Sequence, residues 1–309
     1  MRILLTGSNG FVLQALVKVL GTQAYEIVTT TRDVTHSADT FGRIVVGDLH
    51  ADTNWCDAVH GVDAVVHLAA RVHILRDTTN ALAEFRRVNT DGTLNLARQS
   101  ASAGVRRFIF FSTIGVNGNS TSGGKCFTEV DVPHPHDPYS VSKYEAEVGL
   151  RAISKSTGME IVIIRPTLVH GSKAPGNFGR LTRLVAKGLP LPLASIKNRR
   201  SLVGIDNLVS FIMTCLEHPS AANETFLVSD GEDLSTPDLI RRMARAMDRP
   251  TRLLPVPEPV LMTAAAMLGR RDMAQRLCGS LQVDISKSRE LLGWNPPVSV
   301  DEGLRRAVK

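Results

Sequence analysis

Tyr139 and Lys143 are the two residues of this sequence whose types and spacing are best suited to chemistry. They lie four residues apart in PYSVSK, at the start of a stretch with helical character. On a helix this spacing places both side chains on one face. A nearby ammonium group favours phenolate and lowers the pKa of the phenol, so Tyr139 could exchange a proton near neutral pH. The spacing alone leaves open an ordinary exposed pair.

A glycine-rich turn, TGSNG at 6–10, follows the first apolar run and precedes a segment with helical spacing at 11–20. Such a turn presents backbone N–H groups and the positive end of a helix to a pyrophosphate. Gly7 permits the tight turn, and Gly10 lets the backbone approach the ligand. Leu13 stands where a third glycine is expected, and it should push the helix slightly away from the strand unless its neighbours are small.

The end of the second apolar run bears on the choice of dinucleotide. In NAD sites an acidic residue there binds the ribose diol. Here EIVTTT ends at Thr31, and Arg32 and Asp33 follow. Arg32 could meet a 2′-phosphate, which favours NADP as the cofactor. If Arg32 is only a surface residue, Asp33 would take the ribose, so NAD stays possible.

Strand-like and helical segments alternate along the first half of the chain. Continuous apolar strands separated by helices are typical of a parallel sheet covered on both faces. The predicted fold class is therefore α/β, a Rossmann-type doubly wound parallel sheet. The expected strands are 2–6, 26–31, 43–48, 63–70, 106–113 and 159–167, and the expected helices between them are 11–20, 52–60, 80–104 and 139–157.

The regular alternation is lost after Pro166, which indicates a second part of the chain. The predicted NAD(P)-binding Rossmann domain spans 1–170, and 203–228 returns to it. A smaller C-terminal substrate-binding lobe is expected from 171–202 and 229–309.

The composition is that of a globular protein of 309 residues, 43% hydrophobic and 21% charged. Its four cysteines have no paired spacing and indicate reduced thiols in a cytoplasmic protein, with no zinc site. The first residues run directly into a strand and turn, so no signal peptide is expected. No apolar run reaches the roughly 20 residues of a membrane span. The apolar segment 259–268 is expected to be a core helix, with attachment to a membrane interface as the alternative.

The net charge of +6 is compatible with a nucleic-acid partner or with an anionic substrate such as a diphosphate. Aromatic residues make up only 5% of the chain, and acidic residues interrupt the arginines of 241–276. The small anionic molecule is therefore favoured, and no nucleic-acid partner is expected.

Together these features resemble the extended short-chain dehydrogenase/reductase family, and in particular its nucleotide-sugar epimerase/dehydratase/reductase branch. The resemblance covers nearly the whole chain. It depends on many short matches in a fixed order, which are more specific than any single one. They are TGSNGF (6–11), GDL (47–49), HLAA (67–70), VNTDGTLNL (88–96), FFSTIGVNG (110–118), PYSVSK (138–143), RPTLVHG (165–171), RRSLVGIDNL (199–208) and LLGW (291–294).

The resemblance implies roles for individual residues. Tyr139 would be the catalytic acid and base, Lys143 would tune it and hold the nicotinamide ribose, and Thr113 would hydrogen-bond the sugar oxygen at the reacting carbon. The implied cofactor-binding residues are Gly7, Asn9, Gly10, Phe11, Arg32, Asp48, Leu49, Leu68, Ala69, Ala70, Asn89, Ser112, Tyr139, Lys143 and Pro166. The implied substrate-binding residues are Thr113, Asn177, Arg200 and Arg276, of which Asn177 and the arginines would meet a diphosphate.

Departures from the family pattern narrow the reaction. Ile114 and Gly115 follow Thr113, whereas family dehydratases carry acids there and 3,5-epimerases a cysteine at the second position. Chemistry at C4 of a UDP-type sugar remains. Reduction of a 4-keto sugar in surface-polysaccharide (O-antigen) biosynthesis is favoured, and 4-epimerisation with tightly bound NAD is the alternative. A non-catalytic NADPH-sensing or scaffold protein is a further alternative, although such proteins usually lose Tyr139 or Lys143.

Two further expectations come from the resemblance. Asn117 and His170 replace family tyrosines and are expected to pack near the pocket, with His170 more suited to a structural hydrogen bond than to catalysis. Family members often pair through two long helices, so a homodimer is expected through 80–104 and 139–157.

Overall fold

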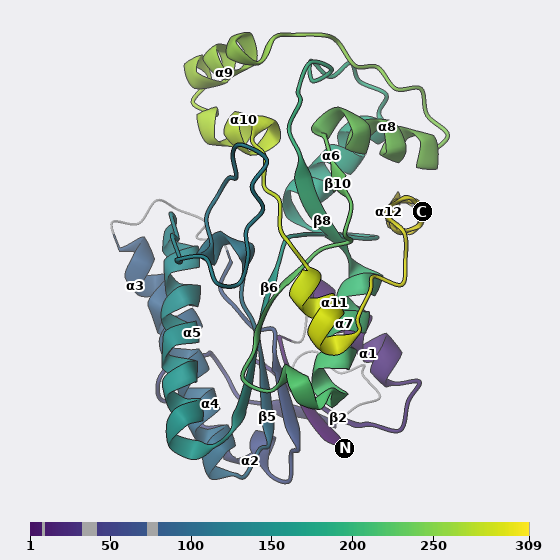
Figure 1. Ribbon diagram of the computed structural model, residues 1–309. Helices are drawn as coiled ribbons and strands as arrows, with labels where there is room; N and C mark the ends of the chain where they lie inside the picture. The colour runs from purple at the N-terminus through teal and green to yellow at the C-terminus, as the bar shows by residue number, and fades with distance from the viewer. Residues whose placement is uncertain (8–9, 33–41, 73–79, 309) are drawn as a thin grey trace.

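Seven parallel strands form the central sheet of this computed structural model, which describes residues 1–7, 10–32, 42–72 and 80–308 (Figure 1). The strand order is β3-β2-β1-β4-β5-β6-β9. The first six strands have the doubly wound order of a Rossmann fold, so the predicted fold class is confirmed. The strands are β1 (Arg2–Thr6), β2 (Glu26–Thr31), β3 (Gly42–Val45), β4 (Ala64–His67), β5 (Arg107–Phe111), β6 (Glu160–Pro166) and β9 (Thr225–Val228).

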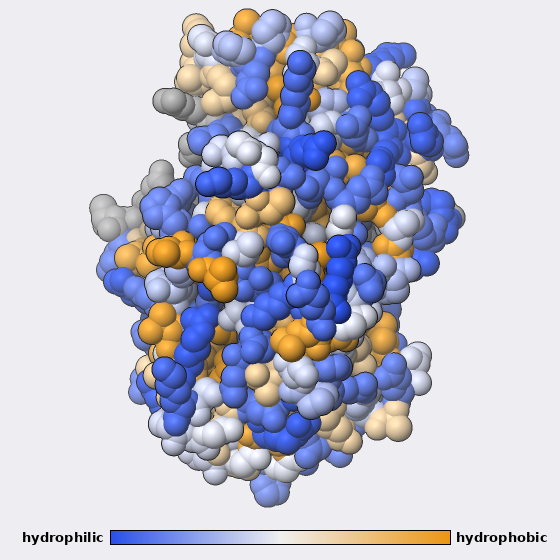
Figure 2. All heavy atoms as spheres, in the orientation of Figure 1, coloured by the Kyte–Doolittle hydropathy of each residue, from blue (hydrophilic) through white to orange (hydrophobic). Residues whose placement is uncertain are grey.

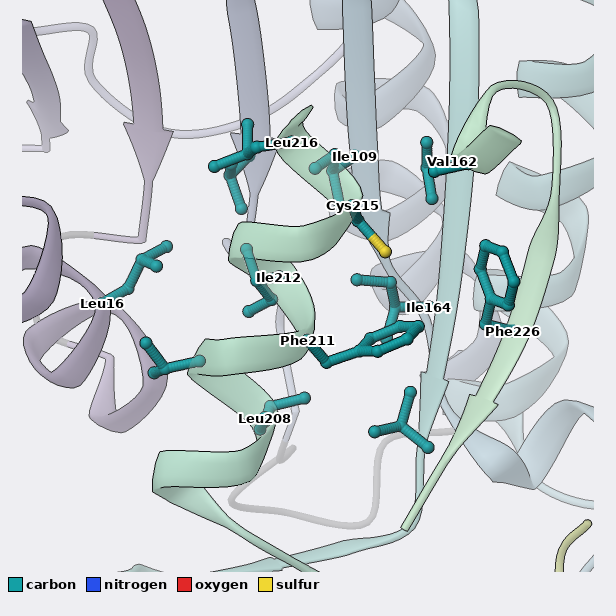
Figure 3. Packing of buried hydrophobic residues seen from close by; sticks show 14 of the residues in the cluster. Leu16, Ile109, Val162, Ile164, Leu208, Phe211, Ile212, Cys215, Leu216 and Phe226 are labelled. Carbon is teal, nitrogen blue, oxygen red and sulfur yellow. The ribbon is translucent and has the colours of Figure 1, made fainter. Parts of the chain in front are cut away.

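Helices cover both faces of this sheet, because successive side chains of a buried strand point to opposite sides. In β1, Ile3 and Leu5 belong to one core cluster, whereas Leu4 belongs to the other. The helices α1 (Phe11–Leu20) and α7 (Ile205–Glu217) pack on the first face, and α4 (Thr93–Ser102) and α5 (Pro138–Thr157) on the second. Figure 3 shows side chains of β5 and β6 meeting α7 on the first face.

A second, smaller sheet lies beyond the carboxyl ends of the large one, in the order β10-β8-β7. Its strands are β7 (Leu168–His170), β8 (Arg200–Gly204) and β10 (Asp233–Leu234). A separate apolar cluster joins it to three helices. These are α6 (Gly176–Ala186), α8 (Thr236–Ala246) and α12 (Val300–Val308). The remaining helices of the C-terminal third are α9 (Glu258–Met267), α10 (Arg271–Cys278) and α11 (Ser286–Leu292).

Helix α5 begins where its sequence provides an N-cap. The Asp137 side chain accepts a hydrogen bond from the Ser140 N–H at 2.9 Å, and Pro138 takes the first helical position. The helix ends at Gly158, whose φ of 79° suits a residue without a side chain. Tyr139 is thereby fixed in the first turn, above the carboxyl ends of the strands.

The segment predicted as one helix at 80–104 is helical but not uniform. It consists of α3 (Ala81–Phe85), a π-helical stretch η1 (Arg86–Gly92) and α4. A π-helical stretch is rare, is frequent at functional sites, and has no clear signal in the apolar periodicity.

The prediction that 259–268 forms a core helix is wrong. Helix α9 occupies this segment and has no buried residue. Val260 is 56% exposed, Met267 84% and Leu268 74%. The apolar composition was read as burial, but only one side of α9, with Leu261 and Met262, packs against the third core cluster. Within the described residues, no helix has the length and apolar character needed to cross a membrane.

We expect Arg107→Met to lower the free energy of unfolding by about 3 kcal/mol, because it breaks a buried charged network. The buried Arg107 guanidinium donates to Glu160 at 2.7 Å and to three carbonyls at the end of α7, those of Cys215, Leu216 and His218. Urea unfolding followed by circular dichroism measures the loss.

The matched control is Arg106→Met, at the neighbouring position. Arg106 is 55% exposed and lies 3.6 Å from the same Glu160 carboxylate. An exposed pair of this kind contributes at most about 1 kcal/mol. Equal losses for both variants would contradict the role assigned to Arg107.

Candidate active site

Lys143 joins α5 to the end of β5. Its side chain is buried, and Nζ donates a hydrogen bond to the Phe111 carbonyl at 2.7 Å and lies 4.4 Å from the centre of the Phe110 ring. Tyr139, one turn earlier, is half-buried, and its ring packs edge-on against Phe85 at 6.0 Å. Both side chains therefore lie at the carboxyl edge of the large sheet, where ligands bind in open α/β folds.

The protonation of this pair is governed by burial. Burial raises the pKa of the Tyr139 phenol, and the Asp137 carboxylate raises it further. Burial lowers the pKa of Lys143 to about 7, although Glu147 opposes this shift. The net pKa shift of Tyr139 is therefore upward, and the downward shift predicted from its spacing to Lys143 is wrong. The low-dielectric surroundings disfavour the charged forms of both groups at once.

Gly115 lies where the end of β5, which leads into Thr113, meets the first turn of α5, which carries Tyr139. The Thr113 hydroxyl accepts the Gly115 N–H at 3.2 Å and caps the short 3-10 helix η2 (Ile114–Val116). A Cβ atom added to Gly115 would lie 2.3 Å from Ser140 Oγ and 3.5 Å from Thr113 Oγ1. The strand end that carries Thr113 thus touches the turn that carries Tyr139. Any larger residue at 115, acidic or cysteine, would have to displace Ser140.

The glycine-rich turn lies directly against the end of β4. Gly7 has a φ of 99°, and a Cβ atom there would lie 3.0 Å from the Ala69 nitrogen. The Gly10 N–H donates to the Gly7 carbonyl at 2.8 Å, and the Ala69 N–H donates to Thr6 Oγ1 at 3.3 Å. Leu68, Ala69 and Ala70 are half-buried beside the turn. Asn9 lies outside the described residues.

His67, the first residue of HLAA, has no role implied by the sequence and supports this wall. Its ring is buried between the Thr6 and Thr93 hydroxyls, with Nδ1 2.7 Å from one and Nε2 2.9 Å from the other. Burial and the nearby Lys143 lower the pKa of His67 to about 3, so the ring is neutral.

The structure shows how three other residues singled out from the sequence are packed; these are Phe11, Leu13 and Pro166. Leu13 is buried in the core cluster between α1 and the sheet. The half-buried Phe11 ring reaches Gly171, where an added Cβ atom would lie 2.9 Å from its tip. Pro166 is buried at the end of β6, paired with Val228 of β9.

Arg32, Asp48 and Leu49 lie together beyond the ends of β2 and β3. Arg32 Nη1 is 3.7 Å from Asp48 Oδ1, and both side chains are mostly exposed. Leu49 is half-buried and faces Gly92, where an added Cβ atom would lie 3.3 Å from the Leu49 Cβ.

Asn89 lies in the π-helical stretch and joins it to helix α5. Its side chain bonds the Arg71 backbone on both sides, accepting at 2.8 Å and donating at 3.0 Å, and donates to Ser142 Oγ at 3.1 Å. Ser142 directly precedes Lys143. The Asn89 side chain, in the π-helical stretch, therefore holds Ser142 of α5, the residue directly before Lys143.

A buried ion pair that sequence reasoning missed supports the same helix. Arg165 and Glu147 form two hydrogen bonds, at 2.9 and 2.6 Å, and are almost fully buried. Glu147 also accepts from Ser112 Oγ at 2.6 Å, and Arg165 donates to Asn117 Oδ1 at 2.9 Å. The available signals were an arginine within the apolar run IVIIRP and a glutamate one turn after Lys143.

The structure brings two of the predicted substrate residues together. Arg200 Nη1 donates to the carbonyls of Arg276 and Gly279, each at 2.9 Å. Burial lowers the pKa of Arg200, and the charge of Arg276 lowers it further. Asn177 is exposed in the first turn of α6, and no hydrogen bond of the described chain joins it to either arginine.

His170 has a structural environment. Its ring is buried, with Nε2 2.9 Å from Asp230 Oδ2, and lies against Phe178 at 5.4 Å. Asp230 also accepts from the Gly204 N–H and from Asn207, so the histidine belongs to a network at the end of β8.

Comparisons with known proteins agree with this arrangement. The family model described as "NAD dependent epimerase/dehydratase family" matches residues 3–229. A protein of Vibrio cholerae named UDP-glucose 4-epimerase is 47% identical over 99% of this chain and 94% of its own.

Two further matches are more distant. A protein of Escherichia coli O157:H7 named N-acetyl-alpha-D-glucosaminyl-diphospho-ditrans,octacis-undecaprenol 4-epimerase is 26% identical over 99% of this chain and 94% of its own. The solved UDP-glucuronic acid 4-epimerase of Bacillus cereus, in complex with NAD, has a TM-score of 0.80 at 22% identity and covers 100% of this chain and 97% of its own. At that identity the likeness shows the fold.

Gly115→Ala should lower kcat by about tenfold or more, because a misplacement of the order of 1 Å at a reacting group costs that much. The new methyl group would displace Ser140, whose hydroxyl and N–H both bond Asp137, and would shift the turn that carries Tyr139. Steady-state kinetics of sugar turnover check this. Gly42→Ala is the control, since a Cβ atom there comes no closer than 3.9 Å to its neighbours, and equal loss in both variants would contradict the assignment.

The lowered pKa of Lys143 predicts a pH-dependent stability. Between its folded pKa of about 7 and its ordinary value of 10.5, the unfolded chain binds more protons at this residue than the folded chain. Stability therefore rises with pH across this window, by up to about 1.4 kcal/mol per pH unit. We expect urea unfolding at pH 7, 8 and 9 to show this rise in the wild type relative to Lys143→Met. Parallel pH profiles would show that the folded lysine keeps an ordinary pKa.

Proposed function

The chain belongs to the NAD dependent epimerase/dehydratase family and is an enzyme of the extended short-chain dehydrogenase/reductase type, and we propose that it is a UDP-sugar 4-epimerase. The observation that carries the proposal is the 47% identity, over nearly both full lengths, to a protein named UDP-glucose 4-epimerase. This reverses the ranking made from the sequence, which placed a 4-keto-sugar reductase first. The two reactions share the same C4 chemistry, so the catalytic residues alone do not separate them.

The proposed mechanism assigns one task to each side chain. Tyr139 removes the proton of the C4 hydroxyl and returns it after the sugar has turned in the site. Its raised pKa keeps the phenol protonated at neutral pH, the form that donates to a C4 carbonyl. Lys143 in its ammonium form stabilises the phenolate of the other half-reaction, and Thr113 donates a hydrogen bond to the sugar oxygen. When bound, NAD supplies the hydride acceptor and donor for C4.

We propose NAD as the cofactor. The expectation of NADP depended on Arg32, but the carboxylate of Asp48 lies 3.7 Å from its guanidinium and offsets the charge that a 2′-phosphate would need. The family and the NAD-bound structure of a fold relative point the same way. Gly7, Gly10 and the Leu68–Ala70 wall would hold the pyrophosphate, and the contact of Gly7 with Ala69 leaves no room for a side chain between them.

The substrate would bind across the two parts of the chain. Arg200 and Arg276, together with Asn177, are proposed to meet the UDP diphosphate, whose charge would relieve the repulsion between the guanidinium groups. The proposed division assigns 1–170 and 203–228 to cofactor binding, and 171–202 and 229–309 to the sugar nucleotide. A homodimer through α3, α4 and α5 and a cytoplasmic location remain part of the proposal.

A second candidate substrate is a sugar carried by a polyprenyl diphosphate, as in the name of the E. coli relative. The observation that favours it is the exposed apolar helix α9, which directly precedes α10 and its Arg276. A diphosphate is common to both carriers, so the same arginines would serve either one.

We expect the purified protein to interconvert UDP-glucose and UDP-galactose without added reductant. Tyr139→Phe should lower kcat by about 10²–10⁴-fold, because general acid–base catalysis contributes that much. Product ratios from nuclear magnetic resonance measure turnover, and protein fluorescence titration measures NAD binding, which should be unchanged in this variant.

The matched control is Tyr144→Phe, a tyrosine of the same helix one residue beyond Lys143. Consumption of NADPH with a UDP-4-keto-6-deoxy sugar, without interconversion, would restore the reductase. Turnover only of the polyprenyl-linked sugar would favour the second candidate, and unchanged turnover in Tyr139→Phe would refute the mechanism.

A further inference from the structure

Helix α9 is apolar around most of its circumference, and only one side of it is covered. Between Glu258 and Arg270 the sequence PVLMTAAAMLG contains no charged residue. Leu261 and Met262 are half-buried and pack against the core cluster of the smaller sheet. A helix that is apolar all round is normally buried, so the uncovered side of α9 needs an explanation.

The uncovered side forms a continuous stripe. Val260, Ala264, Met267 and Leu268 follow one another at the spacing of a single helix face, and all four are exposed. Their exposure reaches 84% for Met267 and 74% for Leu268. These are among the most exposed large apolar side chains of the described chain, and they are adjacent, unlike the scattered apolar residues that any surface carries.

Basic residues outnumber acidic ones between 248 and 270. Arg249 and Arg252 lie on the segment that leads into α9, and Arg270 lies just after it; all three are exposed, as are the two acidic residues there, Asp248 and Glu258. The ion pairs of the preceding helix are made by Arg241 and Arg242. The side chains of Arg249, Arg252 and Arg270 form no ion pair with the described residues, although their backbones form hydrogen bonds. The charge of these guanidinium groups is therefore available to an anionic partner.

The position of α9 suits a planar partner. In Figure 1, α9 and the 247–257 segment form the upper end of the molecule, the far end from the large sheet. Figure 2 shows apolar atoms at this end beside hydrophilic ones. An exposed apolar stripe with a basic border is the composition of helices that lie in the interface of an anionic bilayer.

We propose that α9 docks this enzyme on the surface of a membrane that contains anionic phospholipid. The stripe from Val260 to Leu268 enters the headgroup boundary, and the flanking arginines bind lipid phosphates. Helix α10 follows immediately and carries Arg276, beside Arg200. Docking therefore brings the proposed diphosphate site close to the lipid headgroups. The inference goes beyond the proposed reaction and does not require either carrier of the sugar.

Vesicle flotation tests the proposal with the full chain. We expect the protein to float with vesicles of phosphatidylcholine and phosphatidylglycerol, and to float less at high salt or with phosphatidylcholine alone. The triple variant Val260→Ser, Met267→Ser, Leu268→Ser should lower the partition coefficient at least about tenfold, because it removes three inserted apolar side chains. Since these side chains are exposed, its melting temperature should match that of the wild type.

The matched control replaces exposed apolar residues elsewhere. Val130 and Val132 are 90% and 86% exposed on the loop before α5, and Val130→Ser with Val132→Ser should leave flotation unchanged. Absence of flotation, or equal flotation of the triple variant and the wild type, would overturn the proposal. Loss of a dimer in the triple variant, measured by light scattering, without flotation of the wild type would assign α9 to a contact between two copies.

Discussion

The hydrogen bond from Lys143 to the Phe111 carbonyl is the contact on which the candidate site depends. It fixes helix α5 against the end of β5, the strand that continues into Thr113. The buried pair of Glu147 and Arg165 repeats this attachment one turn further along, through Ser112 and the end of β6. Two polar attachments in succession set both the rotation and the height of α5. Tyr139 can therefore occupy only a narrow range of positions above the sheet.

Burying these polar groups costs free energy of folding. The same burial accounts for the electrostatics of the site. Burying a lysine without a carboxylate in direct contact lowers its pKa, and burying a tyrosine near an aspartate raises the pKa of the phenol. Both groups are thus displaced toward their neutral forms. Of the two, only Lys143 has a pKa near neutral, so its charge can change at neutral pH while Tyr139 stays protonated. The free site therefore holds the phenol in the form that donates a proton.

The sequence was sufficient for the fold class and for the places of the first six strands along the chain, because buried parallel strands and glycine turns leave strong local patterns. It was insufficient wherever a property depended on residues far apart in the chain. The sign of the pKa shift at Tyr139 depends on burial by distant segments, and the Glu147–Arg165 pair joins positions 18 residues apart on different elements. The π-helical stretch around Asn89 and the exposure of α9 likewise follow from tertiary contacts. An apolar helix has the same sequence whether its second face is covered or free.

Arg200 and Arg276, in the smaller part of the chain, are the charged residues proposed to bind the substrate. Arg200 is half-buried beside the exposed Arg276, and its own hydrogen bonds go to backbone carbonyls and not to a carboxylate. The charge of Arg276 acts on the Arg200 guanidinium, and no ion pair within the described chain engages either residue. An anion with two negative phosphates would offset this repulsion. Binding of a diphosphate should therefore tighten the contact between β8 and α10. Since only a short turn separates α10 from the surface helix α9, the diphosphate site and the proposed membrane-docking helix lie close together in the chain.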